Sequence, residues 1–179
     1  KEDMVYYFDI KYYKGENWYL DFYKDYNNEK IIGDTTVTYI RNYEAPKRIY
    51  NLNKDAKIIF TFRNPIDRAF SHYWHEKKKQ KINFEFKECL ENYDLYSDWI
   101  ETGFYYKHVQ RYLEYFPREN IKIMIFDDLK DSPVEFIKEI YKFLEVDSDF
   151  IPSVLNKKVN KAGYVRNNKQ KIYKILNKG

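Results

Sequence analysis

The distribution of apolar and polar residues along the chain predicts strands that alternate with helices. Short, Ile-rich runs at residues 30–36, 57–62 and 121–126 have the length of strands, and the second run is apolar at nearly every position. A strand of this composition is typical of a parallel sheet that is covered on both faces. The pattern predicts an α/β fold with a central, largely parallel sheet flanked by helices.

Helical periodicity appears between and after these runs. Pro65 fits the first turn of a helix, and apolar residues at the spacing of one helix face follow it. These residues are Ile66, Ala69, Phe70, Tyr73 and Trp74. A second helical pattern runs over residues 105–116 and ends before Pro117. A third begins at Pro133, and residues 167–176 predict a short amphipathic helix.

Composition narrows the class of protein. With 179 residues, of which 44% are hydrophobic, the chain fits a single domain that spans residues 1–179. No run approaches the roughly 20 apolar residues that a membrane-spanning helix requires. Cys89 is the one cysteine, so an internal disulfide and a Cys-based metal cluster are excluded.

The charge and the glycines bear on the type of ligand. The 32 Lys and Arg residues exceed the 28 Asp and Glu residues, and the net charge of +4 is compatible with an anionic ligand without requiring one. The five glycines are scattered, so neither of the common Gly-rich phosphate loops occurs. Because the chain opens at Lys1 without an initiator Met or a signal peptide, we expect it to begin inside a longer protein.

The residues that follow the second strand are the strongest candidates for a site. Ligands of parallel sheets bind outside the carboxyl ends of the strands, and there residues 63–73 read RNPIDRAFSHY. The guanidinium of Arg63 and the hydroxyl of Ser71 could converge on one phosphate group, supported by the dipole of the helix. The structural alternative is an ion pair between Arg63 and Asp67, with Ser71 on a solvated helix face.

Residues 57–73 resemble the 3′-phosphate-binding strand and helix of sulfotransferases that use 3′-phosphoadenosine 5′-phosphosulfate, in particular the heparan sulfate branch. Other segments resemble this family in the same order along the chain. They are YYFDIKYYKGENWY at 6–19, IGDTTVTYI at 32–40, YFPRENIKIMIFDDLKDSP at 115–133 and NKAGYVRNN at 160–168. The resemblance implies a P-loop-like sulfotransferase fold over nearly the whole chain.

The resemblance also implies roles for individual residues. Arg63 and Ser71 would hold the 3′-phosphate of the donor, and Arg166 would contact its phosphates. The reaction would transfer a sulfuryl group to a hydroxyl or amine of a glycan or small-molecule acceptor, and it needs a base but no metal. The residue that acts as the base in this branch would correspond to Glu2, with Asp3 as the alternative. The usual spacing of the family would place the base at the position that Met4 occupies here.

The same predicted helix carries two histidines, His72 and His75. His75 matches a position at which some glycan-modifying members carry a histidine near the site, and its alternative is a surface role beside Glu76. His72 lies three residues before His75, but the sequence positions no third ligand, so no metal site is predicted.

Relatives in the resembled family carry a phosphosulfate-binding loop upstream of the segment that starts this chain, and that loop is absent from these residues. The alternative function is therefore a non-catalytic module that binds a nucleotide or anion and has lost the phosphate loop. Binding of nucleic acid through Lys and Tyr is permitted by composition but is not favoured by the ordered motifs. These residues favour a cytoplasmic location, with the Golgi as the alternative if an upstream anchor exists; the acceptor and the oligomeric state stay open.

Overall fold

The computed structural model describes residues 4–153 and residue 155. Strands β1 (Ile58–Phe62) and β2 (Ile121–Ile125) pair in parallel, with Phe62 opposite Ile125. Helices of four residues or more are α1 (Glu16–Leu20), α2 (Ala45–Leu52), α3 (Pro65–Lys78), α4 (Glu88–Glu91), α5 (Tyr93–Trp99), α6 (Tyr105–Leu113), α7 (Phe126–Asp131) and α8 (Pro133–Leu144). Single turns of 3-10 helix are η1 (Tyr12–Lys14), η2 (Asp21–Tyr23), η3 (Tyr39–Arg41), η4 (Glu101–Gly103) and η5 (Arg118–Asn120).

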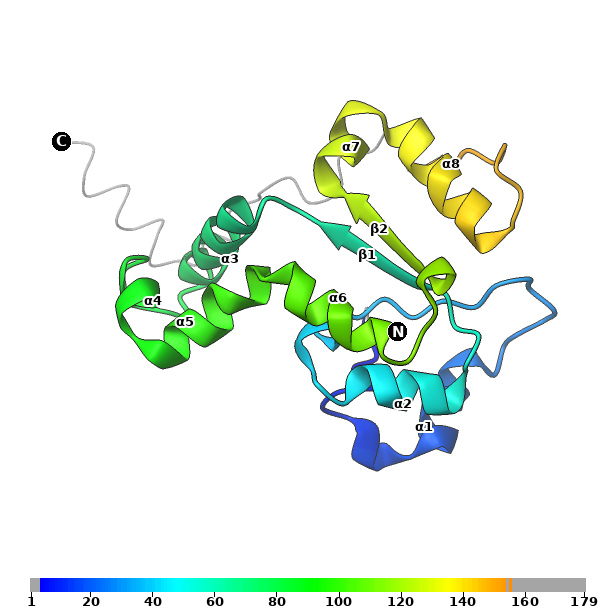
Figure 1. The fold of residues 1–179 in the computed structure, drawn as a ribbon, viewed down its shortest axis with the longest axis horizontal. Helices are drawn as coiled ribbons and strands as arrows, with labels where there is room; N and C mark the ends of the chain where they lie inside the picture. Colours follow the sequence, from blue (N-terminus) through cyan, green and yellow to red (C-terminus); the bar gives the residue numbers. More distant parts are fainter. Residues whose placement is uncertain (1–3, 154, 156–179) are drawn as a thin grey trace, which may run out of the picture.

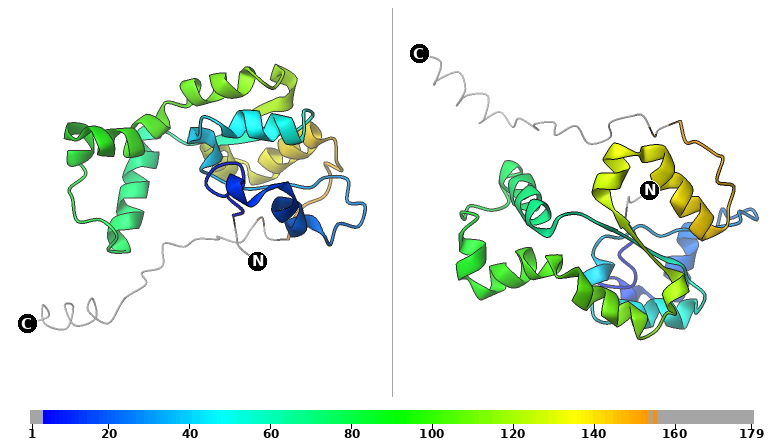
Figure 2. Two further views of the ribbon diagram at one scale, coloured as in Figure 1. Left: turned by 90° about the horizontal axis from the view of Figure 1, so that it is seen from below. Right: turned by 45° about the horizontal axis from the view of Figure 1, so that its top comes forward.

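The two strands lie at the centre, and the helices surround them (Figure 1). One sheet face packs on α6, where the main core cluster consists of Phe60, Phe62, Val109, Tyr112, Phe116 and Ile121. On the other face Lys122 of β2 bonds Glu139 of α8 at 2.5 Å. Helices α3, α4 and α5 form a lobe at one end of β1, which stands apart from α7 and α8 in both views of Figure 2. The expected α/β fold with a parallel sheet is confirmed.

Aromatic residues form much of the core outside the sheet. Tyr7, Phe8, Tyr19 and Tyr39 are buried around Ala45 of α2, and in the other lobe Tyr73 packs with Cys89 and Trp99. Edge-to-face contacts are frequent among these rings, as between Phe8 and Tyr19 at 5.0 Å. The high aromatic content of the sequence therefore serves packing at many positions.

Two expectations about local structure are wrong. Residues 30–36 form a connection without strand pairing, and Ile31 and Ile32 are about half exposed. A run rich in β-branched residues becomes a strand only where a neighbouring strand accepts its hydrogen bonds, and within the described residues none lies beside it.

The apolar face expected on α3 is only partly buried. Ala69 and Tyr73 are buried, but Ile66, Phe70 and Trp74 line an outer side of the helix, with Ile66 74% exposed. Tyr73 packs on Trp99 of α5, and the i, i+4, i+8 row stays outside. Trp74, which is 43% exposed, is therefore not part of the described core.

Candidate functional site

Arg63 lies directly after β1, at the edge of the sheet where both strands end. Because Phe62 is opposite Ile125, the residues that follow the two strands are neighbours, and the Arg63 guanidinium lies 5.9 Å from the centre of the Phe126 ring at the start of α7. The hydroxyl of Tyr105 in α6 donates to the Arg63 carbonyl oxygen at 3.0 Å. The backbone of Arg63 is thus fixed by a helix that lies far along the sequence.

The Arg63 side chain has a buried donor without a partner among the described residues. Its Nε is buried and bonds no atom of the described residues, and the ion pair with Asp67 that was the structural alternative does not form among them. A buried charged donor left unsatisfied is costly, so such a group in a folded protein is often the partner of a ligand or ordered water. A phosphate oxygen would satisfy this donor.

The N-terminus of α3 offers no free backbone amide to an anion. Pro65 has no N–H, the side chain of Asn64 accepts from the amides of Ile66 and Asp67 at 3.0 and 3.3 Å, and the amide of Arg68 donates to the Asn64 carbonyl at 2.9 Å. Asn64 is therefore an N-cap that occupies the donors most helices leave open. Anion binding here depends on side chains, with only the helix dipole in addition.

Ser71 and His75 both lie on α3 and are exposed. The Ser71 hydroxyl has no hydrogen-bond partner among the described residues and is available to a ligand, two turns after Pro65. His75 has its Nε2 3.7 Å from a carboxylate oxygen of Glu76, which also pairs with Lys81 at 3.2 Å. The structure joins neither residue to Arg63 by a direct contact.

Other residues expected at the site lie outside the described residues. Glu2, Asp3 and Arg166 are among them, so their roles stay predictions. Met4, which occupies the position that the family spacing gives to the base, is half buried.

Two segments that resemble the sulfotransferase family are in contact. Thr38 donates its hydroxyl to the buried carboxylate of Asp9, and the Tyr6 amide lies 3.5 Å from the Thr36 hydroxyl. Arg48 of α2 donates to the carbonyl oxygens of Phe8 and Asp9, each at 3.0 Å. Segments 6–19 and 32–40 thus form one hydrogen-bonded unit, which sequence reasoning did not predict.

Asp127 and Asp128 follow shortly after the end of β2. Both carboxylates lie inside the first turn of α7, and no side chain caps that helix at Ile125. Asp127 instead pairs with Lys130. Their position still matches the positive end of the helix dipole.

Like His75, His72 is an exposed residue of α3, but its ring packs on a neighbouring side chain. Its ring stacks on Trp99 at 4.2 Å with an interplanar angle of 19°. Burial lowers the pKa of His72, and the positive charge of Arg68 lowers this pKa further, while Glu76 opposes the shift. The neutral imidazole is thus the form that the folded protein favours.

We expect stability to fall as the pH drops below about 6.5, the usual pKa of an unfolded histidine. There the unfolded chain takes up a proton that folded His72 resists, and stability decreases toward acid pH until the lowered folded pKa is passed. Melting temperatures of the protein and of His72→Gln, measured between about pH 7.5 and 5.5, should show a flatter profile for the variant. Equal slopes, with exposed His75→Gln as control, would contradict the expectation.

Within the described residues no group of three His, Cys, Asp or Glu side chains is placed to bind a metal ion. No described helix has the length and apolar character needed to cross a bilayer.

The parallel sheet, the arginine at the end of β1 and the capped helix after it indicate an α/β protein with a candidate anion site at the carboxyl end of a strand. A family model for the sulfotransferase domain matches residues 18–177, and the chain belongs to this family. It is 30% identical over 158 residues to the human bifunctional heparan sulfate N-deacetylase/N-sulfotransferase 3, a match that covers 81% of this chain and 18% of that protein.

A second relative is the mouse heparan sulfate glucosamine 3-O-sulfotransferase 5, which is 29% identical over 149 residues and matches 77% of this chain and 42% of its own length. The crystal structure of a sulfotransferase from Alicyclobacillus acidocaldarius superposes with a TM-score of 0.72 at 28% identity, covering 83% of this chain and 63% of that one. The resemblance to the heparan sulfate branch is confirmed, while this chain spans less than half of either curated relative.

Proposed function

We propose that this chain is the part of a sulfotransferase that binds 3′-phosphoadenosine 5′-phosphosulfate and delivers its sulfuryl group to a hydroxyl or amine of a glycan or small acceptor. The observation that carries the proposal is the Arg63 side chain, whose buried Nε has no partner at the carboxyl end of β1. Membership of the sulfotransferase family and the names of the heparan sulfate relatives support the reaction and the acceptor class.

Arg63 and Ser71 are proposed to hold the 3′-phosphate. The guanidinium supplies planar, charge-assisted donors, and the exposed Ser71 hydroxyl supplies one more. Because every amide at the start of α3 is absent or already bonded, the two side chains carry the specific contacts with the anion. Arg166 is proposed to contact the donor phosphates as well.

The proposed reaction is a displacement at sulfur. An acceptor oxygen or nitrogen forms a bond to sulfur, and the bond between sulfur and the bridging oxygen of the donor breaks, which releases 3′-phosphoadenosine 5′-phosphate. The acceptor proton passes to a base, for which Glu2 is proposed, with Asp3 as the alternative. His75 is proposed to orient the acceptor, because its side chain is 60% exposed and can contact an acceptor.

The geometry supports a holding role for Arg63. Its backbone is fixed by the Tyr105 bond and its side chain lies against Phe126, so little conformational freedom is lost when an anion binds. Such fixed positioning of the donor places its sulfur for in-line attack, which is the main contribution a protein makes to a transfer of this type.

The test is transfer of labelled sulfate by the complete natural protein. It is supplied with the labelled donor and a panel of sulfated and unsulfated glycans, phenols and amines, beside Arg63→Ala and the exposed Lys54→Ala as charge-matched control. We expect label in a glycan with the protein and with Lys54→Ala but not with Arg63→Ala. Nucleotide binding without transfer to any acceptor would replace the proposal with a non-catalytic binding module, and neither binding nor transfer would end it.

A further inference from the structure

A second group of arginines lies around the end of α5. Arg68 of α3 donates Nη2 to the carbonyl oxygen of Trp99, and Arg41 of η3 has Nη1 3.8 Å from a carboxylate oxygen of Asp98. Because Asp98 and Trp99 are consecutive, the two guanidiniums lie in the same region, and the charge of Arg41 acts on Arg68. This pair, Arg41 and Arg68, is distinct from Arg63, whose side chain lies against α7.

The pair has little negative charge to balance it. Asp98 is 74% exposed at the side chain and its contact with Arg41 is long, which makes the ion pair weak in water. Burial lowers the pKa of Arg68, Tyr105 opposes this shift, and the positive charge of Arg41 lowers the pKa further. Two like charges held together in this way favour a bound anion.

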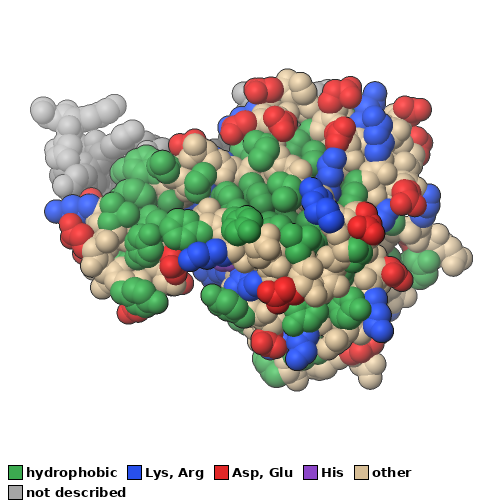
Figure 3. All heavy atoms as spheres, viewed as in Figure 1, with side chains coloured by type: hydrophobic (Ala, Val, Ile, Leu, Met, Phe, Trp, Pro, Cys, Tyr) green, Lys and Arg blue, Asp and Glu red, His purple; other side chains and the backbone are tan. Residues whose placement is uncertain are grey.

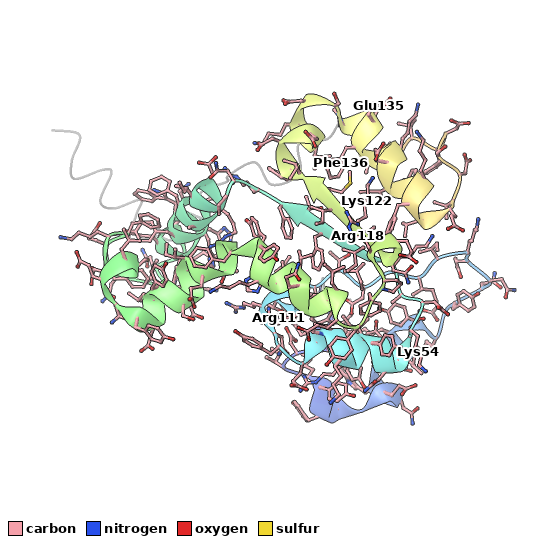
Figure 4. The ribbon with its side chains drawn as sticks, in the orientation of Figure 1. Lys54, Arg111, Arg118, Lys122, Glu135 and Phe136 are labelled. Atoms are coloured by element: carbon pink, nitrogen blue, oxygen red, sulfur yellow. The ribbon has the colours of Figure 1, made fainter. Side chains whose placement is uncertain are left out.

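Donors without partners occur in the same place. Nε of Arg68 is buried and forms no hydrogen bond with a described atom. The same holds for Nε of Arg111 in α6. Arg111 donates Nη2 to the carbonyl oxygen of Ile40 at 2.8 Å, and Ile40 directly precedes Arg41. Buried donors of this kind call for an ion or water as partner, and Figure 4 shows Arg111 on α6 beside the segment that contains η3.

An exposed aromatic ring lies next to these cations. The Arg111 guanidinium stacks on Tyr43 at 4.0 Å from the ring centre, while Tyr43 stays 77% exposed. One face of the ring is supported by the cation, and the other is open to a flat apolar ligand surface, such as that of a sugar ring. On the face drawn in Figure 3, basic side chains and a histidine gather between two groups of hydrophobic side chains near this part of the molecule.

We propose that Arg41 and Arg68 form a second oxyanion site, separate from the 3′-phosphate site, which holds a carboxylate or sulfate group of an acidic saccharide whose ring lies on Tyr43. The exposed half of Arg41 makes the first contact, and Arg68 Nε supplies the buried donor. That the saccharide is the acceptor rests on the proposed function, whereas the anion site itself does not.

The bond from Arg68 to the Trp99 carbonyl also stabilises the end of α5, so removal of Arg68 would mix binding with stability. Arg41 is the better probe, because it is 47% exposed at the side chain and its described ion pair is weak. Arg41→Gln keeps much of the size of Arg41 and serves if Arg41→Ala does not fold. Lys54→Ala, at an exposed position near the end of α2, is the charge-matched control.

The experiment is calorimetric titration at fixed salt of the full chain, these variants and Arg63→Ala. The probes are inorganic sulfate, a sulfated uronate-containing hexasaccharide, a neutral hexasaccharide and 3′-phosphoadenosine 5′-phosphate. We expect Arg41→Ala to weaken the binding of the acidic hexasaccharide by about tenfold and to leave nucleotide binding unchanged. We expect Arg63→Ala to weaken nucleotide binding and to leave hexasaccharide binding unchanged.

Hexasaccharide binding that is equal in Arg41→Ala and the parent chain would overturn the site. Sulfate binding that depends on Arg41, with no gain from the hexasaccharide over sulfate, would overturn the saccharide as its ligand. Failure of nucleotide binding in every chain, with saccharide binding still lost in Arg41→Ala, would count against the proposed function alone.

Discussion

Replacement of Arg63 by alanine is expected to weaken the binding of 3′-phosphoadenosine 5′-phosphate by at least about 100-fold. Hydrogen bonds to charged groups contribute about 1.5–3 kcal/mol each, and two from one guanidinium reach this loss. No backbone donor can take over, because Pro65 has no amide hydrogen and Asn64 occupies the next three amides. Calorimetric titration of both chains at low and moderate salt measures the effect.

Two further variants separate charge from geometry. Arg63→Lys keeps the positive charge but loses the planar pair of donors, so its affinity is expected between those of the parent chain and Arg63→Ala. Lys54→Ala removes one positive charge at an exposed position and should bind as the parent does. Affinities of Arg63→Ala and the parent within about twofold of each other, with both chains folded, would remove Arg63 from the site.

Phe116→Ala is expected to lower the free energy of unfolding by about 3–5 kcal/mol. Phe116 is 1% exposed and belongs to the core between α6 and the sheet. Its ring meets Tyr50 edge-on at 5.6 Å and lies 6.5 Å from the ring of Tyr112. Truncation opens a cavity that these rigid rings cannot fill.

Thermal unfolding followed by circular dichroism measures this loss, which corresponds to a fall in melting temperature of about 10 °C. The matched control is Phe150→Ala, because Phe150 is 60% exposed and its removal should change the free energy of unfolding by less than about 0.5 kcal/mol. Comparable losses in the two variants would show that the cluster between α6 and the sheet is not the dominant core.

The elements nearest the candidate site could be predicted from the sequence. Strands β1 and β2 and the start of α3 at Pro65 agree with the expected ranges, because a continuous apolar run and a proline after a polar cap are signals carried by adjacent residues. Residues 30–36 carry a similar run, yet form no strand. Their composition is compatible with a strand, but pairing depends on a neighbour that composition does not specify.

The site was predicted in part. Arg63 was found from its position after a strand, and the structure adds that its Nε is buried and unpaired. The contact with Tyr105 joins residues 42 positions apart, and no local pattern could indicate it. Arg41 and Arg68 both reach the end of α5 from segments far apart in the chain, and no local pattern could indicate the second oxyanion site.

The sequence by itself determined the alternation of strands and helices, the family through the order of its motifs, and the identity of the arginine that follows β1. Only the tertiary structure decided that Asn64 takes up the amides of α3, that Ile66 and Trp74 face outward, and that Arg41 and Arg68 both reach the end of α5. The physical reason is range. Periodicity, capping and motif order are properties of residues close in the chain, whereas burial and charge pairing are fixed by which distant segments come together.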